Sequence, residues 1–168
     1  TDNKDNDYFQ LTYIGTGSGD YPWNSFQNCT SLTYIGESSF YNGLLRNLII
    51  NSNALGGCAI NSYAFYNCNF IGTGGDGFPS GFNTLQLGGV VSIGANAFGI
   101  SSSNVNAYTS VSLDPTTQII GESAFFNCLS ITTLVIPTSS QLQSIGDYAF
   151  GTDNKDNDYF QLTYIGTG

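Results

Sequence analysis

The sequence predicts a β-rich solenoid, in which short right-handed coils stack along one axis. Residues 1–17 recur without a change at 152–168, so the two copies are offset by 151 residues (152 minus 1). A shorter motif recurs inside this unit, and alternating apolar runs separate its copies. A coil of a few tens of residues cannot bury its own apolar side chains, whereas stacked coils cover one another.

The shorter motif begins with an isoleucine, usually followed by glycine, and has a phenylalanine five residues after the isoleucine. A looser copy begins at Ile14 and reaches Phe26 after an insertion, and a seventh copy begins at Ile165. Six coils therefore make one super-repeat, residues 1–151, and residues 152–168 begin the next. We predict that the isoleucines form one buried column and the phenylalanines another: Ile35, Phe40, Ile60, Phe65, Ile93, Phe98, Ile120, Phe125, Ile145 and Phe150.

Apolar residues alternate with polar ones between the motifs, which predicts strands at 45–50, 82–87, 108–113 and 131–136. The glycine-rich stretch at 71–81 is predicted to be a surface loop. The glycine that follows the repeat isoleucine predicts a tight or left-handed turn at that position.

These motifs resemble the BspA-like leucine-rich repeat. The best matches are ITTLVIPTSSQLQSIGDYAF at 131–150 and IIGESAFFNC at 119–128. The resemblance implies coils of the leucine-rich-repeat kind in a surface-exposed or secreted protein that is often adhesive.

Charge and composition argue against several classes of function. Only 9% of the residues are charged, the net charge is −9, and Lys4, Arg46 and Lys155 are the basic residues. A nucleic-acid partner or an anionic lipid surface needs a basic face. No run of 18 apolar residues predicts a membrane span. The chain has no histidine and no phosphate-binding or nucleophile motif, so we do not expect an enzyme.

The cysteines fall into two groups. Cys29, Cys68 and Cys128 each lie three residues after a repeat phenylalanine, which predicts a small buried thiol at that place in the coil. Cys58 lies elsewhere in its coil and is the remaining candidate for a disulfide or a free thiol.

The sequence contains two weaker candidate sites. An Asp-Asn run recurs once per super-repeat, and its carboxylates are calcium candidates, although a solvated loop is the alternative: Asp2, Asp5, Asp7, Asp153, Asp156 and Asp158. Asn28 begins the one Asn-X-Ser/Thr sequence, a candidate glycosylation site. No other cofactor is expected.

Two functions remain open from the sequence. The first is a structural segment of a long extracellular filament or cell-surface stalk, whose partners are further copies of the chain stacked end to end. The second is a surface adhesin whose solenoid face binds host or matrix proteins. Tyrosines such as Tyr13, Tyr34 and Tyr164, which precede repeat isoleucines, fit either a binding surface or packing between solenoids.

Overall fold

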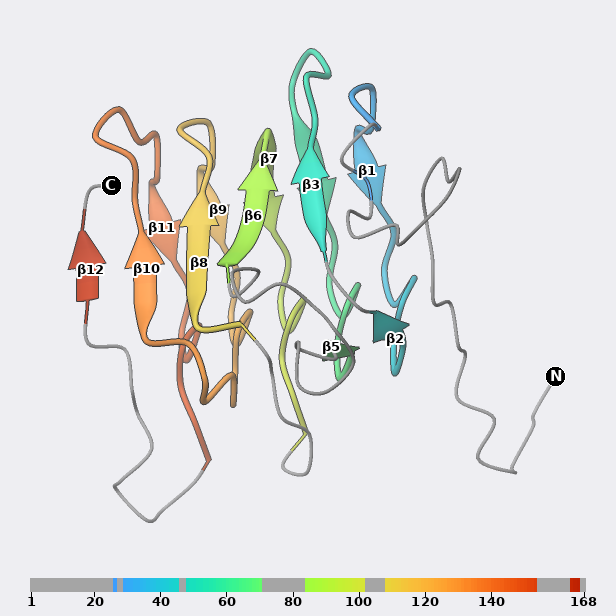
Figure 1. The fold of residues 1–168 in the computed structure, drawn as a ribbon, viewed down its shortest axis with the longest axis vertical. Helices are drawn as coiled ribbons and strands as arrows, with labels where there is room; N and C mark the ends of the chain where they lie inside the picture. Colours follow the sequence, from blue (N-terminus) through green and yellow to red (C-terminus); the bar gives the residue numbers. More distant parts are fainter. Residues whose placement is uncertain are drawn as a thin grey trace, which may run out of the picture.

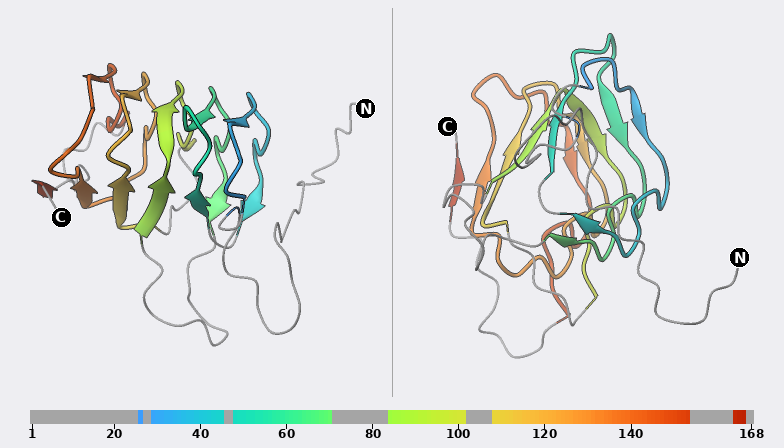
Figure 2. Two further views of the ribbon diagram at one scale, coloured as in Figure 1. Left: turned by 90° about the horizontal axis from the view of Figure 1, so that it is seen from above. Right: turned by 45° about the vertical axis from the view of Figure 1, so that its right-hand side comes forward.

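The fold consists of two parallel β-sheets that face each other across one core, as Figure 1 shows. The computed structural model describes residue 26 and residues 29–45, 48–70, 84–101, 108–153 and 164–166, and none of these residues is helical. Successive coils add one strand to each sheet, so the strands form two rows along the stack (Figure 2). This arrangement confirms the predicted fold class, a β-rich solenoid.

The first sheet, here called the isoleucine sheet, contains the strands that carry the repeat isoleucines. Its order is β1 (Tyr34–Ile35), β4 (Cys58–Ile60), β7 (Val90–Ile93), β9 (Ile119–Ile120) and β11 (Ser144–Ile145). The register aligns Ile35 with Ile60, Ile60 with Ile93, Ile93 with Ile120 and Ile120 with Ile145. The isoleucines therefore form one row across the sheet.

The second sheet is built from the alternating apolar runs. Its order is β12 (Tyr164–Gly166), β10 (Thr133–Val135), β8 (Ser110–Leu113), β6 (Thr84–Gly88) and β3 (Ile49–Asn51). A separate two-stranded sheet pairs β2 (Leu44–Leu45) with β5 (Asn69–Phe70). Inward-facing Leu85, Val111 and Leu134 lie in register and are buried against the isoleucine sheet.

One coil contributes to a single sheet. Residues 29–40 supply β1 to the isoleucine sheet but no strand to the second sheet, which ends at β3. Beside β3 this coil is held by individual hydrogen bonds, from the Asn53 N–H to the Thr30 carbonyl (2.7 Å) and from the Ser52 hydroxyl to the Leu32 carbonyl (2.6 Å). The second sheet is therefore one strand shorter than the coil stack at this end.

The phenylalanines form a stacked ladder through the core. The rings of Phe40, Phe65, Phe98, Phe125 and Phe150 follow one another at centroid distances of 5.1, 5.2, 5.1 and 5.0 Å, with interplanar angles of 4–7°. Phe26 meets Phe40 edge-on instead, at 5.8 Å and 70°. The inner rings are fully buried, and their spacing is close to the ~4.8 Å between neighbouring strands.

The turn between each isoleucine and phenylalanine repeats its backbone hydrogen bonds from coil to coil. In the turn after β9, Ser123, Phe125 and Asn127 donate their N–H groups to the carbonyls of Asp147, Ala149 and Gly151 at 2.7–2.9 Å. Equivalent bonds join the earlier turns to one another. The turns that end at Phe40, Phe65, Phe98 and Phe125 thus each donate three hydrogen bonds to the coil that follows.

A tight turn begins at the glycine after the isoleucine, which is one of the two predicted alternatives: the Ala97 and Ala124 N–H groups donate to the carbonyls of Gly94 and Gly121. The other alternative, a left-handed backbone at the glycine, is wrong. Gly94, Gly121 and Gly146 do not have a positive φ. A Cβ on Gly94 would meet the carbonyl carbon of Asn61 at 2.5 Å, and one on Gly146 would meet the Glu122 nitrogen at 2.5 Å. The glycine is therefore needed for the close approach of the preceding coil.

Left-handed backbone occurs two residues after that glycine position, at residues that are not glycine. The φ values there lie between 53° and 57°, at Ser38, Tyr63, Asn96, Ser123 and Tyr148. Left-handed backbone is unfavourable for side chains other than glycine. At four of these positions, Ser38, Tyr63, Asn96 and Ser123, the N–H group donates the first of the three hydrogen bonds to the next coil, and these bonds offset the cost.

Candidate assembly interface

The coil stack exposes apolar side chains at one edge. This edge consists of β11, the turn of residues 146–151 and β12, and is called the terminal edge below. Ile145, Tyr148 and Ile165 are 48%, 71% and 61% exposed there, whereas Ile93 and Ile120 in the same row as Ile145 are buried. Ile145 thus differs from the expected buried column, because in the described part of the chain no coil covers it.

The terminal edge also presents backbone donors. Tyr148 and Phe150 occupy the turn positions that in every inner coil donate an N–H to the following coil, as Ser123 and Phe125 do. Among the described residues, no following coil supplies acceptors to Tyr148 and Phe150. Apolar side chains beside unpaired backbone donors are the features by which a sheet edge accepts a further strand.

The prediction for Ile165 is wrong. We expected it to begin a seventh copy of the isoleucine row, but β12 pairs with β10 in the second sheet, where Ile165 aligns with Leu134. The same letters, LTYIG, place Ile35 in the isoleucine sheet through β1. The same dipeptide, Tyr-Ile, therefore lies in different sheets at two places in one chain, at Tyr34–Ile35 in β1 and at residues 164–165 in β12.

The spacing from the preceding phenylalanine places β12 like β8 and β10, but spacing alone does not fix the sheet: Ile35 lies in the isoleucine sheet only 9 residues after Phe26 (26 to 35), and β6 begins 19 residues after Phe65 (65 to 84). After the turns at Phe98 and Phe125 the chain reaches the second sheet first: β10 begins 8 residues after Phe125 (125 to 133) and β8 begins 12 residues after Phe98 (98 to 110). Ile120 and Ile145, by contrast, lie 22 and 20 residues after the preceding phenylalanine (98 to 120, 125 to 145). β12 begins 14 residues after Phe150 (150 to 164), which suits the second sheet.

Two of the three repeat cysteines are buried and donate to a neighbouring coil. The Cys68 thiol donates to the Phe40 carbonyl at 2.8 Å, and the Cys128 thiol donates to the Phe98 carbonyl at 3.1 Å. Each acceptor is the repeat phenylalanine of the preceding coil. Cys29, at the equivalent position after Phe26, is exposed, so the expectation of a buried thiol is wrong for this residue.

Burial makes the inner thiols poor nucleophiles. Burial raises the pKa of Cys68 to about 12, although the Gly43 backbone N–H opposes it, and raises the pKa of Cys58 to about 11. Cys58 lies in β4 as a buried free thiol. Thiolate is the reactive form, so these two cysteines are not suited to chemistry at neutral pH.

Three tyrosines form a cluster on the turns of two neighbouring coils. Tyr41 stacks on Tyr66 at 5.2 Å, and Tyr63 meets Tyr66 edge-on at 5.3 Å. The Tyr66 ring lies against Gly99, where a Cβ would approach it to 3.2 Å. Tyr41 and Tyr63 remain exposed, so this cluster is an aromatic surface on the side of the stack.

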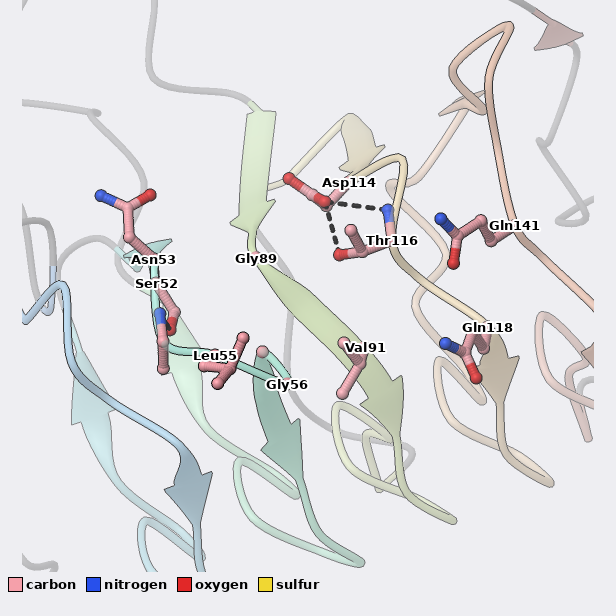
Figure 3. Close-up of a pocket in the computed structure, with 12 residues that line it drawn as sticks. Ser52, Asn53, Leu55, Gly56, Gly89, Val91, Asp114, Thr116, Gln118 and Gln141 are labelled. Carbon is pink, nitrogen blue, oxygen red and sulfur yellow. Dashed lines mark hydrogen bonds between the residues drawn. The ribbon is translucent and has the colours of Figure 1, made fainter.

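A hollow of about 530 Å³ lies where the two sheets are joined (Figure 3). Gly89 alone connects β6 to β7, whereas longer loops connect the strands of the neighbouring coils, so the short link leaves a notch. Polar and apolar groups line the notch together, among them Asn53, Leu55, Val91, Gln118 and Gln141.

Asp114, at the side of this notch, has a structural role. Burial favours a higher pKa for its carboxyl group, but hydrogen bonds from the Thr116 side chain and from the Gly89 and Thr116 N–H groups outweigh that effect and lower the pKa. The carboxylate accepts from the Thr116 N–H at 2.9 Å and from its hydroxyl at 2.6 Å. These bonds hold the link between β8 and β9 and leave the carboxylate engaged within the chain.

The weaker sequence candidates fall largely outside the described residues. Asp153 is described, and its N–H donates to the Asn127 side chain at 3.1 Å. The other calcium candidates and the glycosylation candidate Asn28 lie outside the described part: Asp2, Asp5, Asp7, Asp156 and Asp158. Within the described part, no three acidic, histidine or cysteine side chains are grouped closely enough to hold a metal ion. Over the same residues, no helix is long and apolar enough to cross a membrane.

Comparison with known proteins identifies the repeat. A family model for the BspA-type leucine-rich repeat region matches residues 18–73 and 81–168, in six copies. Searches of curated proteins and of solved structures gave no match. Proteins of this repeat class generally serve binding or structural roles rather than catalysis. The model covers most of the 168 residues, and the chain belongs to the BspA-type leucine-rich repeat family.

Proposed function

We propose that this chain is a structural segment of a long extracellular filament or cell-surface stalk, in which successive units stack end to end. The observation that carries the proposal is the terminal edge, where Ile145, Tyr148 and Ile165 are exposed beside backbone donors of the turn. Exposed apolar side chains and free backbone donors are the groups against which a further coil would pack.

The exact repetition of residues 1–17 at 152–168 supports the same proposal. The same segment then lies at equivalent points of two successive units. The residues that begin one unit have the same sequence as the residues that follow the previous unit. A contact of this head-to-tail kind does not close on itself and therefore produces a linear polymer. A segment that recurs without a change, rather than in a diversified form, suits a structural element.

Assembly of the 168-residue chain tests the proposal. Sedimentation velocity and electron microscopy should show concentration-dependent rods, and Ile145→Glu should abolish them by placing a charge at the terminal edge. The matched control is Ile119→Glu, because Ile119 is comparably exposed, at 45%, but points outward from an inner strand. A chain that stays monomeric at high concentration, or rods that Ile145→Glu leaves intact, would contradict the proposed interface.

A surface adhesin is the second candidate. The exposed cluster of Tyr41, Tyr63 and Tyr66 favours it, since aromatic side chains are enriched where proteins bind one another. This cluster lies on the side of the stack, so it stays accessible in a rod. Saturable binding to one member of a panel of matrix proteins, lost in Tyr41→Ala but kept in Tyr34→Ala, would support adhesion.

A further inference from the structure

We infer that the notch is a binding site for an extended, uncharged segment of a partner protein, which lies where the coil of β6 and β7 has no projecting link. The inference goes beyond end-to-end assembly, because this coil has neighbouring coils on both sides. Three features of the described residues lead to it: the width of the notch, the unpaired amide groups on its walls and the absence of an available charge among the residues that line it.

The short link between β6 and β7 determines the width of the notch. Residues 52–57 connect β3 to β4 and residues 114–118 connect β8 to β9, whereas Gly89 alone connects β6 to β7 between them. Neighbouring strand layers lie ~4.8 Å apart, so the two long links are separated by two layers, or about 10 Å. An extended chain between them lies one layer from each link, which is the spacing of hydrogen-bonded strands. The notch therefore has room for one polypeptide chain.

Side-chain amides stand on both sides of the notch. Asn53 belongs to the β3–β4 link, Gln118 to the β8–β9 link and Gln141 to the β10–β11 link, and Figure 3 shows Val91 between the first two of these links. None of the three amides forms a hydrogen bond with another described residue. Each amide has both donors and an acceptor, so it can pair with the N–H and carbonyl groups of a peptide.

The β3–β4 link also presents backbone groups to a ligand. Among the described residues, the N–H groups of Leu55 and Gly56 have no backbone acceptor, and their carbonyls accept from no backbone donor. Gly56 faces open space, since a Cβ there would meet no atom within 4 Å. A chain in the notch can pair with these groups as an added strand pairs with the edge of a sheet.

The other residues that line the notch favour an uncharged ligand with an apolar side chain. Asp114 is the charged residue of the lining, and its carboxylate already accepts two hydrogen bonds from Thr116. Leu55 is fully exposed and Val91 is half-buried, so both are available to an apolar side chain of the ligand. The volume of about 530 Å³ lies within the range of about 300–1,000 Å³ that is usual for ligand sites.

Selection of peptides tests the site. A display library of short random linear peptides is first depleted on the Gln118→Ala/Gln141→Ala variant and then selected on the full chain. One selected peptide is synthesised and titrated by isothermal calorimetry. The double variant should raise its Kd at least about tenfold, because two hydrogen bonds to the ligand are lost. Gln143→Ala should leave Kd unchanged and is the matched control, since Gln143 is an exposed glutamine of the same β10–β11 link that does not line the notch.

Hydrogen exchange provides the second measurement. The bound peptide should slow exchange at the Leu55 and Gly56 amides at least about fivefold, because it pairs with them. The amide of Ser139 is the control, since this exposed residue of the β10–β11 link does not line the notch.

The contrary outcomes are distinct. A library that yields no peptide after depletion, or a peptide that leaves the Leu55 and Gly56 amides unprotected, would overturn the inference. Sugars from a glycan array that bind through Gln118 and Gln141 in place of peptides would overturn the class of ligand. End-to-end assembly is tested separately, because the Ile145→Glu variant retains every residue that lines the notch.

Discussion

At the scale of single residues, Phe125 tests the ladder most directly, because its ring lies between those of Phe98 and Phe150 at 5.1 and 5.0 Å. Phe125→Ala should lower the free energy of unfolding by about 3–5 kcal/mol, the cost of deleting a buried aromatic side chain. Phe150→Ala is the matched control, with one stacked neighbour and partial exposure, and should cost clearly less. Urea denaturation measures both, and equal losses would show that the rings do not act as a ladder.

Cys68 should make the folded chain sensitive to alkaline pH. Burial raises its pKa from the usual 9.0 to about 12, so the unfolded chain loses this proton at a lower pH than the folded chain. The contribution of this thiol to stability is therefore complete below pH 9 and is lost as the pH rises toward 12. Cys68→Ala should reduce the fall in unfolding free energy over this range. Cys29→Ala, which removes an exposed thiol, is the control, and identical pH profiles for both variants would contradict the assignment.

At the scale of elements, Gly89 forms the whole link between β6 and β7. Its φ is +70°, and a Cβ there would clash with the Ser52 carbonyl oxygen. Gly56 has a φ of +91°, but a Cβ there would meet no atom within 4 Å. Gly56→Ala should cost about 1–2 kcal/mol, the strain of a left-handed backbone.

Gly89→Ala should cost more than Gly56→Ala, because the neighbouring coil must also move. Both variants carry the strain of a left-handed backbone. The difference between their unfolding free energies in urea therefore measures the cost of the steric contact at Gly89 alone. A Gly89→Ala chain as stable as Gly56→Ala would show that the link can shift at no cost.

The sequence predicts the repeating parts of these elements because their spacing is fixed locally. Five residues separate each isoleucine from its phenylalanine, and the buried alternation of β6, β8 and β10 is visible in the letters. The sheet that a strand joins is not a local property, since the same Tyr-Ile pair lies in β1 of one sheet and in β12 of the other. Segment length alone does not decide it, since Ile35 joins the isoleucine sheet 9 residues after Phe26 (26 to 35). The contact between coils that excludes a Cβ at Gly94 or Gly146 likewise depends on a distant part of the chain.

The sequence predicts that coils continue from one unit to the next, but it does not predict which residues form the candidate interface. The recurrence of residues 1–17 indicates a continuing stack, but which residue of the stack is exposed depends on where β12 pairs. The exposure of Cys29 has the same origin. Its place after Phe26 matches that of Cys68 and Cys128, and only the preceding coil distinguishes them.

At the scale of the whole molecule, the stacking of coils determines the axial length of one repeat unit. If six motif copies make one 151-residue unit, as the sequence predicts, then at ~4.8 Å per strand layer they advance by about 29 Å. Fibre diffraction from aligned rods should therefore give a meridional reflection near about 4.8 Å and a layer line near about 29 Å. Rods from the Ile119→Glu variant should give the same pattern. Aligned rods that lack the longer period would show that units do not join in the register of the repeat.

The coil of residues 29–40 gives such a rod two unlike sides. The isoleucine sheet runs through this coil by way of β1, but the second sheet has no strand there and relies on the Thr30 and Leu32 carbonyls as acceptors. On one side, the strand ladder can continue through every layer, and on the other these two hydrogen bonds replace it once in each unit. A rod of these units would resist stretching along the isoleucine side and bend at regular joints on the opposite side. Its flexural behaviour would then be set by the shortest coil of the repeat.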